Sequence, residues 1–95
     1  MPQFELHEQG SQIRRSSKSI KDNIVEGYGR RRYKAEFIRY LVFSQASCDE
    51  ANNQAFTINE LYPDIMDFAE IEKDLDILGK MINKFISYVE SEWRT

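Results

Sequence analysis

The C-terminal third of the chain carries the pattern that most restricts its fold. Its apolar residues are separated by alternating steps of three and four: Phe68, Ile71, Leu75, Leu78, Ile82, Phe85 and Val89. This spacing is a heptad seam, which is typical of an amphipathic helix that packs along another helix. The pattern therefore predicts a helix over residues 66–92 with one side covered by other helices.

Two earlier segments also have helical periodicity, over residues 9–29 and 33–59. In the first segment the apolar residues at helical spacing are Ile13, Ile20, Ile24 and Tyr28. In the second, the residues compatible with one face are Phe37, Ile38, Leu41, Val42, Gln45, Cys48 and Ala55. No segment alternates with the period of two that strands show. The sequence predicts an all-α protein, an antiparallel up-and-down bundle of three long helices in a single domain over residues 1–95.

The breaks between these helices have their own signals. Gly27 or Gly29 is expected to end the first helix in a left-handed conformation. Pro63 separates the second helix from the third, and Asp64 or Asp67 can cap the third. The residues between Gly29 and Glu36 include no Ser, Thr, Asp or Asn, so the second helix is predicted to start without a side-chain cap.

Composition narrows the setting in which the protein works. Cys48 is the one cysteine among 95 residues, so no disulfide can form within the chain. An apolar run of about 18 residues, the length that a membrane span needs, is missing from the sequence. The N-terminus lacks the basic start and apolar stretch of a signal peptide. We therefore expect a cytoplasmic protein with no membrane partner.

Few residues suggest catalysis or metal binding. His7 lies in a mostly polar stretch, and Cys48 is expected to be a small buried thiol. Asp49 and Glu50 have no His or Cys at ligand spacing. The sequence contains no phosphate-binding loop of the Walker type, nucleophile elbow or catalytic triad pattern. We expect a protein that is not an enzyme and uses no metal or cofactor.

Charge is distributed unevenly along the chain, although the net charge is only −3. Residues 11–40 carry nine basic and three acidic side chains, a balance of +6, whereas residues 41–95 carry four basic and eleven acidic, a balance of −7. Such a polarised chain can attract phosphates, or its basic part can face the acidic part of a neighbouring copy. Charge alone leaves both alternatives open.

The densest basic stretch is Gly-Arg-Arg-Arg-Tyr-Lys, residues 29–34, between the first two helices. Guanidinium groups at an uncapped helix start can hold an external anion such as a phosphate. An exposed basic loop that merely ends a helix is the alternative. The candidate phosphate-binding residues are Arg14, Arg15, Arg30, Arg31, Arg32 and Lys34, with the first two expected to lie alongside the loop once the helices pack. Tyr28, Tyr33 and Tyr40 either stack on bases or close the core.

Several motifs occur together within residues 11–50. They are Ser-Gln-Ile-Arg-Arg at 11–15, Ser-Ile at 19–20, Asn-Ile-Val-Glu-Gly-Tyr-Gly-Arg at 23–30, Glu-Phe-Ile-Arg-Tyr-Leu at 36–41, and then Ser47 and Glu50. With these motifs the chain resembles the bacterial four-helix-bundle family of proteins encoded in 23S ribosomal RNA intervening sequences. The resemblance is dense over about forty residues and looser through the third helix.

The resemblance carries its own expectations. It implies a homo-oligomer, commonly a pentameric ring, with a dimer left open. The accessory protein of diversity-generating retroelements resembles the same family, which implies RNA or DNA, or a reverse transcriptase, as partners. Family members usually begin with a further helix ahead of Ser-Gln-Ile-Arg-Arg, so this chain is expected to lack the first helix and to expose an apolar groove. Another subunit is then expected to cover part of the stripes that include Ile13, Ile20, Phe85 and Val89.

The family motif also has a physical interpretation. Asn23 and Glu26 lie three residues apart, hence on one helix face. Glu26 is expected to pair with Arg15 or Arg30, and Asn23 with a neighbouring backbone group or Arg39. A structural role in fixing the first helix on the second is therefore predicted for the motif residues Asn23, Glu26, Gly27, Gly29, Glu36 and Arg39.

These observations lead to three functional hypotheses. In the first, the protein is a non-catalytic oligomeric bundle that binds nucleic acid, or a nucleic-acid enzyme, through its basic segment. In the alternative, it only associates with itself or with a protein partner and has no nucleic-acid role. In the third, which the absence of catalytic motifs disfavours, it is an enzyme that uses carboxylates outside any recognised motif.

Overall fold

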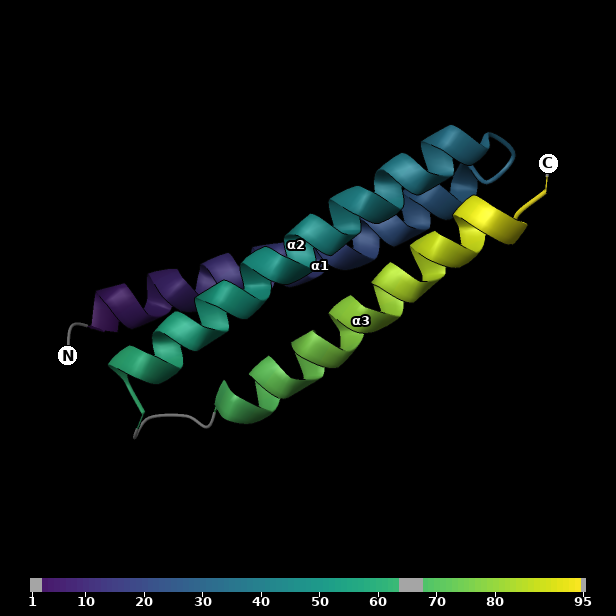
Figure 1. Ribbon diagram of the computed structural model, residues 1–95. Coiled ribbons are helices and arrows are strands. Elements are labelled where there is room, and N and C mark those ends of the chain that lie inside the picture. The colour runs from purple at the N-terminus through teal and green to yellow at the C-terminus, as the bar shows by residue number, and fades with distance from the viewer. Residues whose placement is uncertain (1–2, 64–67, 95) are drawn as a thin grey trace.

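The computed structural model describes residues 3–63 and 68–94, with side chains for residues 7–63 and 70–94 (Figure 1). This part of the chain contains the helices α1 (Gln3–Gly29), α2 (Lys34–Leu61) and α3 (Phe68–Glu92), and no strand. The all-α prediction is confirmed, although α1 begins six residues earlier than predicted. The expected caps Asp64 and Asp67 and the predicted core side chain of Phe68 lie outside the described residues. None of the described helices combines the length and the hydropathy that crossing a bilayer requires.

The helices form an elongated, flattened bundle of 52 × 20 × 12 Å. Both α1 and α3 run antiparallel to α2 and pack against it, so they run in the same direction as each other (Figure 1). Among the described residues, no Cα atom of α1 lies within 8 Å of one in α3. Two helices whose axes lie the usual 8–10 Å apart have some Cα atoms closer to each other than this, so α1 and α3 are farther apart than directly packed helices. The centre of the bundle is therefore α2, which both other helices contact.

A seam along α2 forms the middle of the core. Its buried residues follow steps of four and three: Phe37, Leu41, Ser44, Cys48, Ala51, Ala55 and Ile58. Small side chains in the middle of this seam let α1 and α3 approach α2 closely from both sides. The predicted face was partly wrong, because it included Val42, which is 45% exposed. The seam is visible in the sequence once serine and alanine are counted as core residues.

Hydroxyl groups fix the position of α1 on α2. The buried hydroxyl of Ser44 donates to the backbone oxygen of Ile20 at 2.8 Å. Nearby, the Oγ atoms of Ser19 and Ser47 lie 2.8 Å apart. Because buried polar groups need hydrogen-bond partners, a shift of α1 along α2 would leave these groups unpaired.

The side of α3 that faces α2 differs slightly from the predicted seam. Ile82, Ile86 and Val89 are buried, whereas Phe85 is 38% exposed. A straight helix has 3.6 residues per turn, so a strict heptad seam drifts around it, and Ile86 takes the place assigned to Phe85. Another subunit was expected to cover part of the stripes that include Val89 and Ile20, but each of these two residues is already buried within this chain. That part of the prediction was wrong.

The end of α1 is also built differently from the prediction. No described glycine has a positive φ, so neither Gly27 nor Gly29 is in the left-handed conformation. Helix α1 instead passes into turns through hydrogen bonds such as Arg30 N to Gly27 O at 3.0 Å. Gly27 is needed for a different reason, because a Cβ atom there would lie 3.0 Å from the Cβ of Tyr40 and 3.3 Å from the carbonyl oxygen of Phe37. The glycine allows α1 to approach the start of α2.

Replacing Gly27 with alanine is expected to lower the free energy of unfolding by about 1–2 kcal/mol, because the new methyl group must displace packed atoms. Gly29→Ala is the matched control, since nothing lies within 4 Å of its Cβ position. The control should be neutral or slightly stabilising, as alanine favours helices. Urea unfolding of both variants measures the difference. Equal stabilities would show that close approach at Gly27 does not matter.

Candidate nucleic-acid interface

The loop between α1 and α2 meets the C-terminal end of α3 at one end of the bundle. The indole Nε1 of Trp93 donates to the backbone oxygen of Arg31 at 3.0 Å. The Nζ of Lys34 donates to the backbone oxygen of Glu90 at 2.7 Å. The ring of Trp93 also meets Phe37 edge-on, with centroids 5.2 Å apart. These contacts join segments that are about sixty residues apart in the sequence.

An open depression of about 590 Å³ lies at this junction. Its lining residues are Gly29, Arg31, Arg32, Tyr33, Trp93 and Arg94. We call this site the basic depression. Three of its lining side chains are arginines, and none of the described lining residues is acidic. The predicted lack of a cap on α2 is confirmed here, since Tyr33 is the N-cap residue and makes no side-chain capping hydrogen bond.

Arg31 and Arg32 remain available to a ligand to different degrees. Arg31 lies over the ring of Tyr28 at 4.1 Å, and its Nη1 donates to the backbone oxygen of Tyr28 at 2.9 Å. Its guanidinium group has five N–H donors, and the others make no hydrogen bond with a residue that the structure describes. Arg32 is exposed and makes no hydrogen bond or ion pair with any residue that the structure describes. Lys34 is half-buried and held by Glu90, so it is less available.

Arg30 has a structural role instead. Its Nη2 lies 3.0 Å from Glu26 Oε1 and its Nη1 lies 3.9 Å from Glu36 Oε1. The guanidinium also sits over the ring of Tyr40 at 4.9 Å. The hydrogen bond to Glu26 is the main reason that the pKa of Arg30 is raised above its ordinary value. The predicted pairing of Glu26 with Arg30 is confirmed, and Arg30 joins α1 to α2 rather than lining the depression.

Other motif residues also make contacts within the fold. Asn23 donates to the backbone oxygen of Ser19 at 2.8 Å, which is the neighbouring-backbone contact that was predicted. Arg39 Nη1 pairs with Glu36 Oε2 at 3.3 Å, so Glu36 lies between Arg30 and Arg39. The contacts of Asn23 lie within α1 and the pair of Arg39 lies within α2, whereas Glu36 connects the end of α1 to α2 through Arg30.

Arg14 and Arg15 do not lie beside the loop. Both are exposed on α1. Fifteen residues of continuous helix separate Arg14 from Gly29, a distance of roughly 22 Å at 1.5 Å per residue. The next residue, Ser16, donates to Gln54 in the second half of α2. The expectation that these two arginines join the loop was therefore wrong.

Trp93 and Arg94 are the lining residues that the sequence interpretation missed. An available signal was the topology itself. In an up-and-down bundle of three helices, the end of the third helix returns to the loop that joins the first two. Trp93 is also the sole tryptophan of the chain, placed directly before Arg94.

Comparison with known families supplies the classification. A family described as 23S rRNA-intervening sequence protein matches residues 1–84. The chain belongs to this family. Comparisons with curated proteins and with solved structures gave no match. Family membership confirms the resemblance seen in the sequence motifs, and the description names no ligand.

In this member of the 23S rRNA-intervening sequence protein family, the tyrosines near the loop divide into two groups. Tyr28 is 53% exposed and Tyr33 is 63% exposed, so neither closes the core. Tyr40 is half-buried beneath Arg30. Tyr33 is therefore the tyrosine with a free ring surface inside the basic depression.

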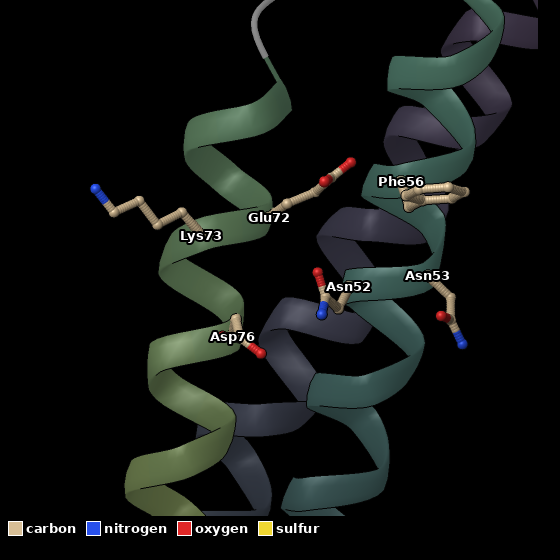
Figure 2. A pocket seen from close by; sticks show the side chains of 6 residues that line it. All are labelled: Asn52, Asn53, Phe56, Glu72, Lys73 and Asp76. Atoms are coloured by element: carbon tan, nitrogen blue, oxygen red, sulfur yellow. The ribbon is translucent and has the colours of Figure 1, made fainter.

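A second depression in this family member, of about 420 Å³, lies between α2 and α3 (Figure 2). Glu72 and Asp76 extend from α3 toward α2, whereas Lys73 points away (Figure 2). The carboxylates of Glu72 and Asp76 make this depression unsuited to binding a phosphate group. Within the described residues, no three His, Cys, Asp or Glu side chains gather in an arrangement that could hold a metal ion.

Cys48 is buried in the α2 seam, as predicted. Its thiol donates to the backbone oxygen of Leu75 at 3.3 Å. Burial, and then the charges of Asp49 and Asp76, raise the pKa of Cys48 above its ordinary value. A thiol of this kind is a poor nucleophile, because the thiolate is the reactive form.

The two neighbouring arginines should differ in their effect on stability. We expect Arg30→Ser to lower the midpoint of urea unfolding, because it removes a network that joins two helices through Glu26 and Glu36. Arg32→Ser should change the free energy of unfolding by less than about 0.5 kcal/mol, as is usual for an exposed surface residue. A larger destabilisation by Arg32→Ser than by Arg30→Ser would contradict these assignments.

Proposed function

We propose that this protein is a non-catalytic, self-associating helical-bundle protein of the cytoplasm that binds RNA or DNA through the basic depression. The observation that carries the proposal is the composition of that depression. Arg31, Arg32 and Arg94 line it together with two aromatic residues, and no carboxylate is among the described lining residues.

The arginines suit phosphate groups. A guanidinium group presents a planar set of donors that can hold a phosphate with two hydrogen bonds. Arg32 and Arg94 are both exposed, and neither forms an ion pair with a described residue. Both add positive charge to one end of a chain whose net charge is −3.

The aromatic residues favour a single-stranded ligand. Tyr33 is 63% exposed and Trp93 is half-buried, so both offer ring surface next to the arginines. Stacking of a base on an aromatic side chain contributes about 1–3 kcal/mol and tolerates any sequence. Bases in a duplex are already stacked on one another. A site that combines phosphate contacts with free aromatic rings therefore suits an unpaired strand.

Other features support the remaining parts of the proposal. Burial raises the pKa of Cys48, so its thiol is unsuited to act as a nucleophile. A single cysteine, which cannot form a disulfide within the chain, supports a reducing compartment such as the cytoplasm. Phosphate contacts carry no sequence information, so binding should be general rather than specific.

A second candidate function is association with protein alone, through another copy or a partner such as a reverse transcriptase. The observation that favours it is the apolar surface of α3, where Ile77 is 48% exposed and Met81 is 61% exposed. A binding experiment with nucleic acid separates the two candidates.

We expect the protein to bind a labelled single-stranded RNA at about 50 mM salt, with affinity falling steeply as salt is added. The double variant Arg32→Ser, Arg94→Ser should bind more weakly. Its log–log salt slope should be lower by about 0.7 for each phosphate group that the variant no longer neutralises. Fluorescence anisotropy over a series of salt concentrations measures both quantities.

The matched control is Arg14→Ser, Arg15→Ser, which removes the same charge from α1 far from the depression. This control should retain most of the affinity. Equally weakened binding by the two double variants would show that binding follows overall charge. No binding by the unmodified protein at about 50 mM salt would reject the nucleic-acid role and favour the second candidate.

A further inference from the structure

We propose that a polar groove between α2 and α3 binds an extended, arginine-containing segment of a partner protein. The groove includes the depression shown in Figure 2 and shares no lining residue with the basic depression. The inference goes beyond the proposed function, because this ligand is a positively charged polypeptide rather than a nucleic acid. The two sites therefore take ligands of opposite charge.

The groove consists of two adjoining depressions, of about 420 and 270 Å³, which share Asn52 and Asp76. Both depressions lie between α2 and α3. Their lining residues on α2 run from Gln45 to Phe56, roughly 16 Å of helix at 1.5 Å per residue. About five residues of extended chain cover the same length. The groove is therefore long enough for a short extended segment.

Amide side chains in this groove are available to a ligand. Gln45, Asn52 and Asn83 line it, and their side chains form no hydrogen bond with any residue that the structure describes. Each amide group presents both an acceptor oxygen and a donor NH₂. An extended peptide carries unpaired backbone N–H and C=O groups that need such partners when they leave water. The amides therefore suit the main chain of a bound peptide.

Carboxylates of α3 have a spacing that matches an extended peptide. Glu72 and Asp76 are four residues apart, roughly 6 Å along the helix. In an extended chain every second side chain faces the same way, and such side chains are about 6.6 Å apart. Two basic residues separated by one other residue can thus reach both carboxylates. Asp49, on α2, adds a third carboxylate farther along the groove.

Glu72 and Phe56 favour arginine as the basic residue. The side chain of Glu72 extends toward α2, and its Oε1 atom is buried without a hydrogen-bond partner (Figure 2). A buried acceptor without a partner is costly, so a donor from a ligand would be favourable there. Phe56 lines the same depression and is 54% exposed. A guanidinium group can donate two hydrogen bonds to a carboxylate and also stack on an aromatic ring.

Two lysines beside these carboxylates leave the groove accessible. Lys73 points away from the depression (Figure 2). Lys80 pairs with Asp76 at 3.1 Å, but the two side chains are 75% and 58% exposed. Exposed ion pairs contribute little to stability. An arginine of the ligand can therefore replace Lys80 as the partner of Asp76.

Binding of a synthetic peptide to the unmodified chain tests the proposal. The probe is a labelled peptide in which arginine alternates with serine, and fluorescence anisotropy measures its binding. The protein should bind this peptide in a saturable way. The double variant Glu72→Gln, Asp76→Asn keeps the shape of the groove but removes its charge, and it should bind at least about tenfold more weakly. No binding by the unmodified protein would overturn the proposal.

The matched control is the double variant Glu70→Gln, Asp74→Asn. It removes the same charge from exposed residues of the same helix that line neither depression. Its affinity should stay within about twofold of the unmodified protein, because exposed charges outside the site are screened by salt. Equal weakening by the two double variants would show that binding follows overall charge, and would overturn the proposal.

Phe56 tests the choice of arginine. Phe56→Leu removes the aromatic ring from an exposed position and should weaken binding of the arginine peptide. A second peptide, with lysine in place of each arginine, should lose less affinity to the same substitution. Equal losses for the two peptides would overturn the assignment of arginine.

Further measurements keep the outcome decisive. If the double variant Glu72→Gln, Asp76→Asn loses helix content by circular dichroism, Asp49→Asn takes its place, since Asp49 is exposed and lines the second depression. A fall in assembly mass on adding the peptide, measured by light scattering, would show that another copy occupies the groove and would overturn the proposal. Peptide binding by a protein that ignores RNA and DNA would support this inference while rejecting the nucleic-acid role.

Discussion

The structure depends on the close packing of both outer helices against the small residues of α2. Ser44, Cys48, Ala51 and Ala55 fill the middle of the seam, so neither α1 nor α3 is held away by bulky side chains. Both helices pack on this one surface, and within the described residues no Cα atom of α1 lies within 8 Å of one in α3. The same packing brings the end of α3 to the loop after α1 and leaves a groove between the outer helices.

Sequence patterns were sufficient for features that depend on local spacing. The three helices, the uncapped start of α2 and the pair between Glu26 and Arg30 all follow from residues within a few positions of one another. Features set by packing were missed. Gly27 is required by the approach of Tyr40 rather than by a positive φ, and Trp93 reaches Arg31 only because the chain returns to that end. Ile86 replaced Phe85 because the helix drifts relative to a strict heptad.

The basic stretch illustrates why a cluster of like residues in sequence need not act together. Arg30 is engaged by two carboxylates and a tyrosine ring, Arg31 is partly engaged by Tyr28, and Arg32 has no partner among the described residues. Structural and ligand-binding tasks are thus divided among three consecutive arginines. Arg94 joins the available group from the far end of the sequence.

The central claim is that nucleic acid binds in the basic depression, and Trp93 tests it most directly. It is the sole tryptophan of the chain and it lines the depression, so its fluorescence reports on this site alone. Titration with an unlabelled single-stranded RNA at low salt should change the intensity of Trp93 emission in a saturable way, and added salt should reverse the change. Binding detected by an independent method with no change in Trp93 emission would place the nucleic acid elsewhere on the protein and contradict the claim.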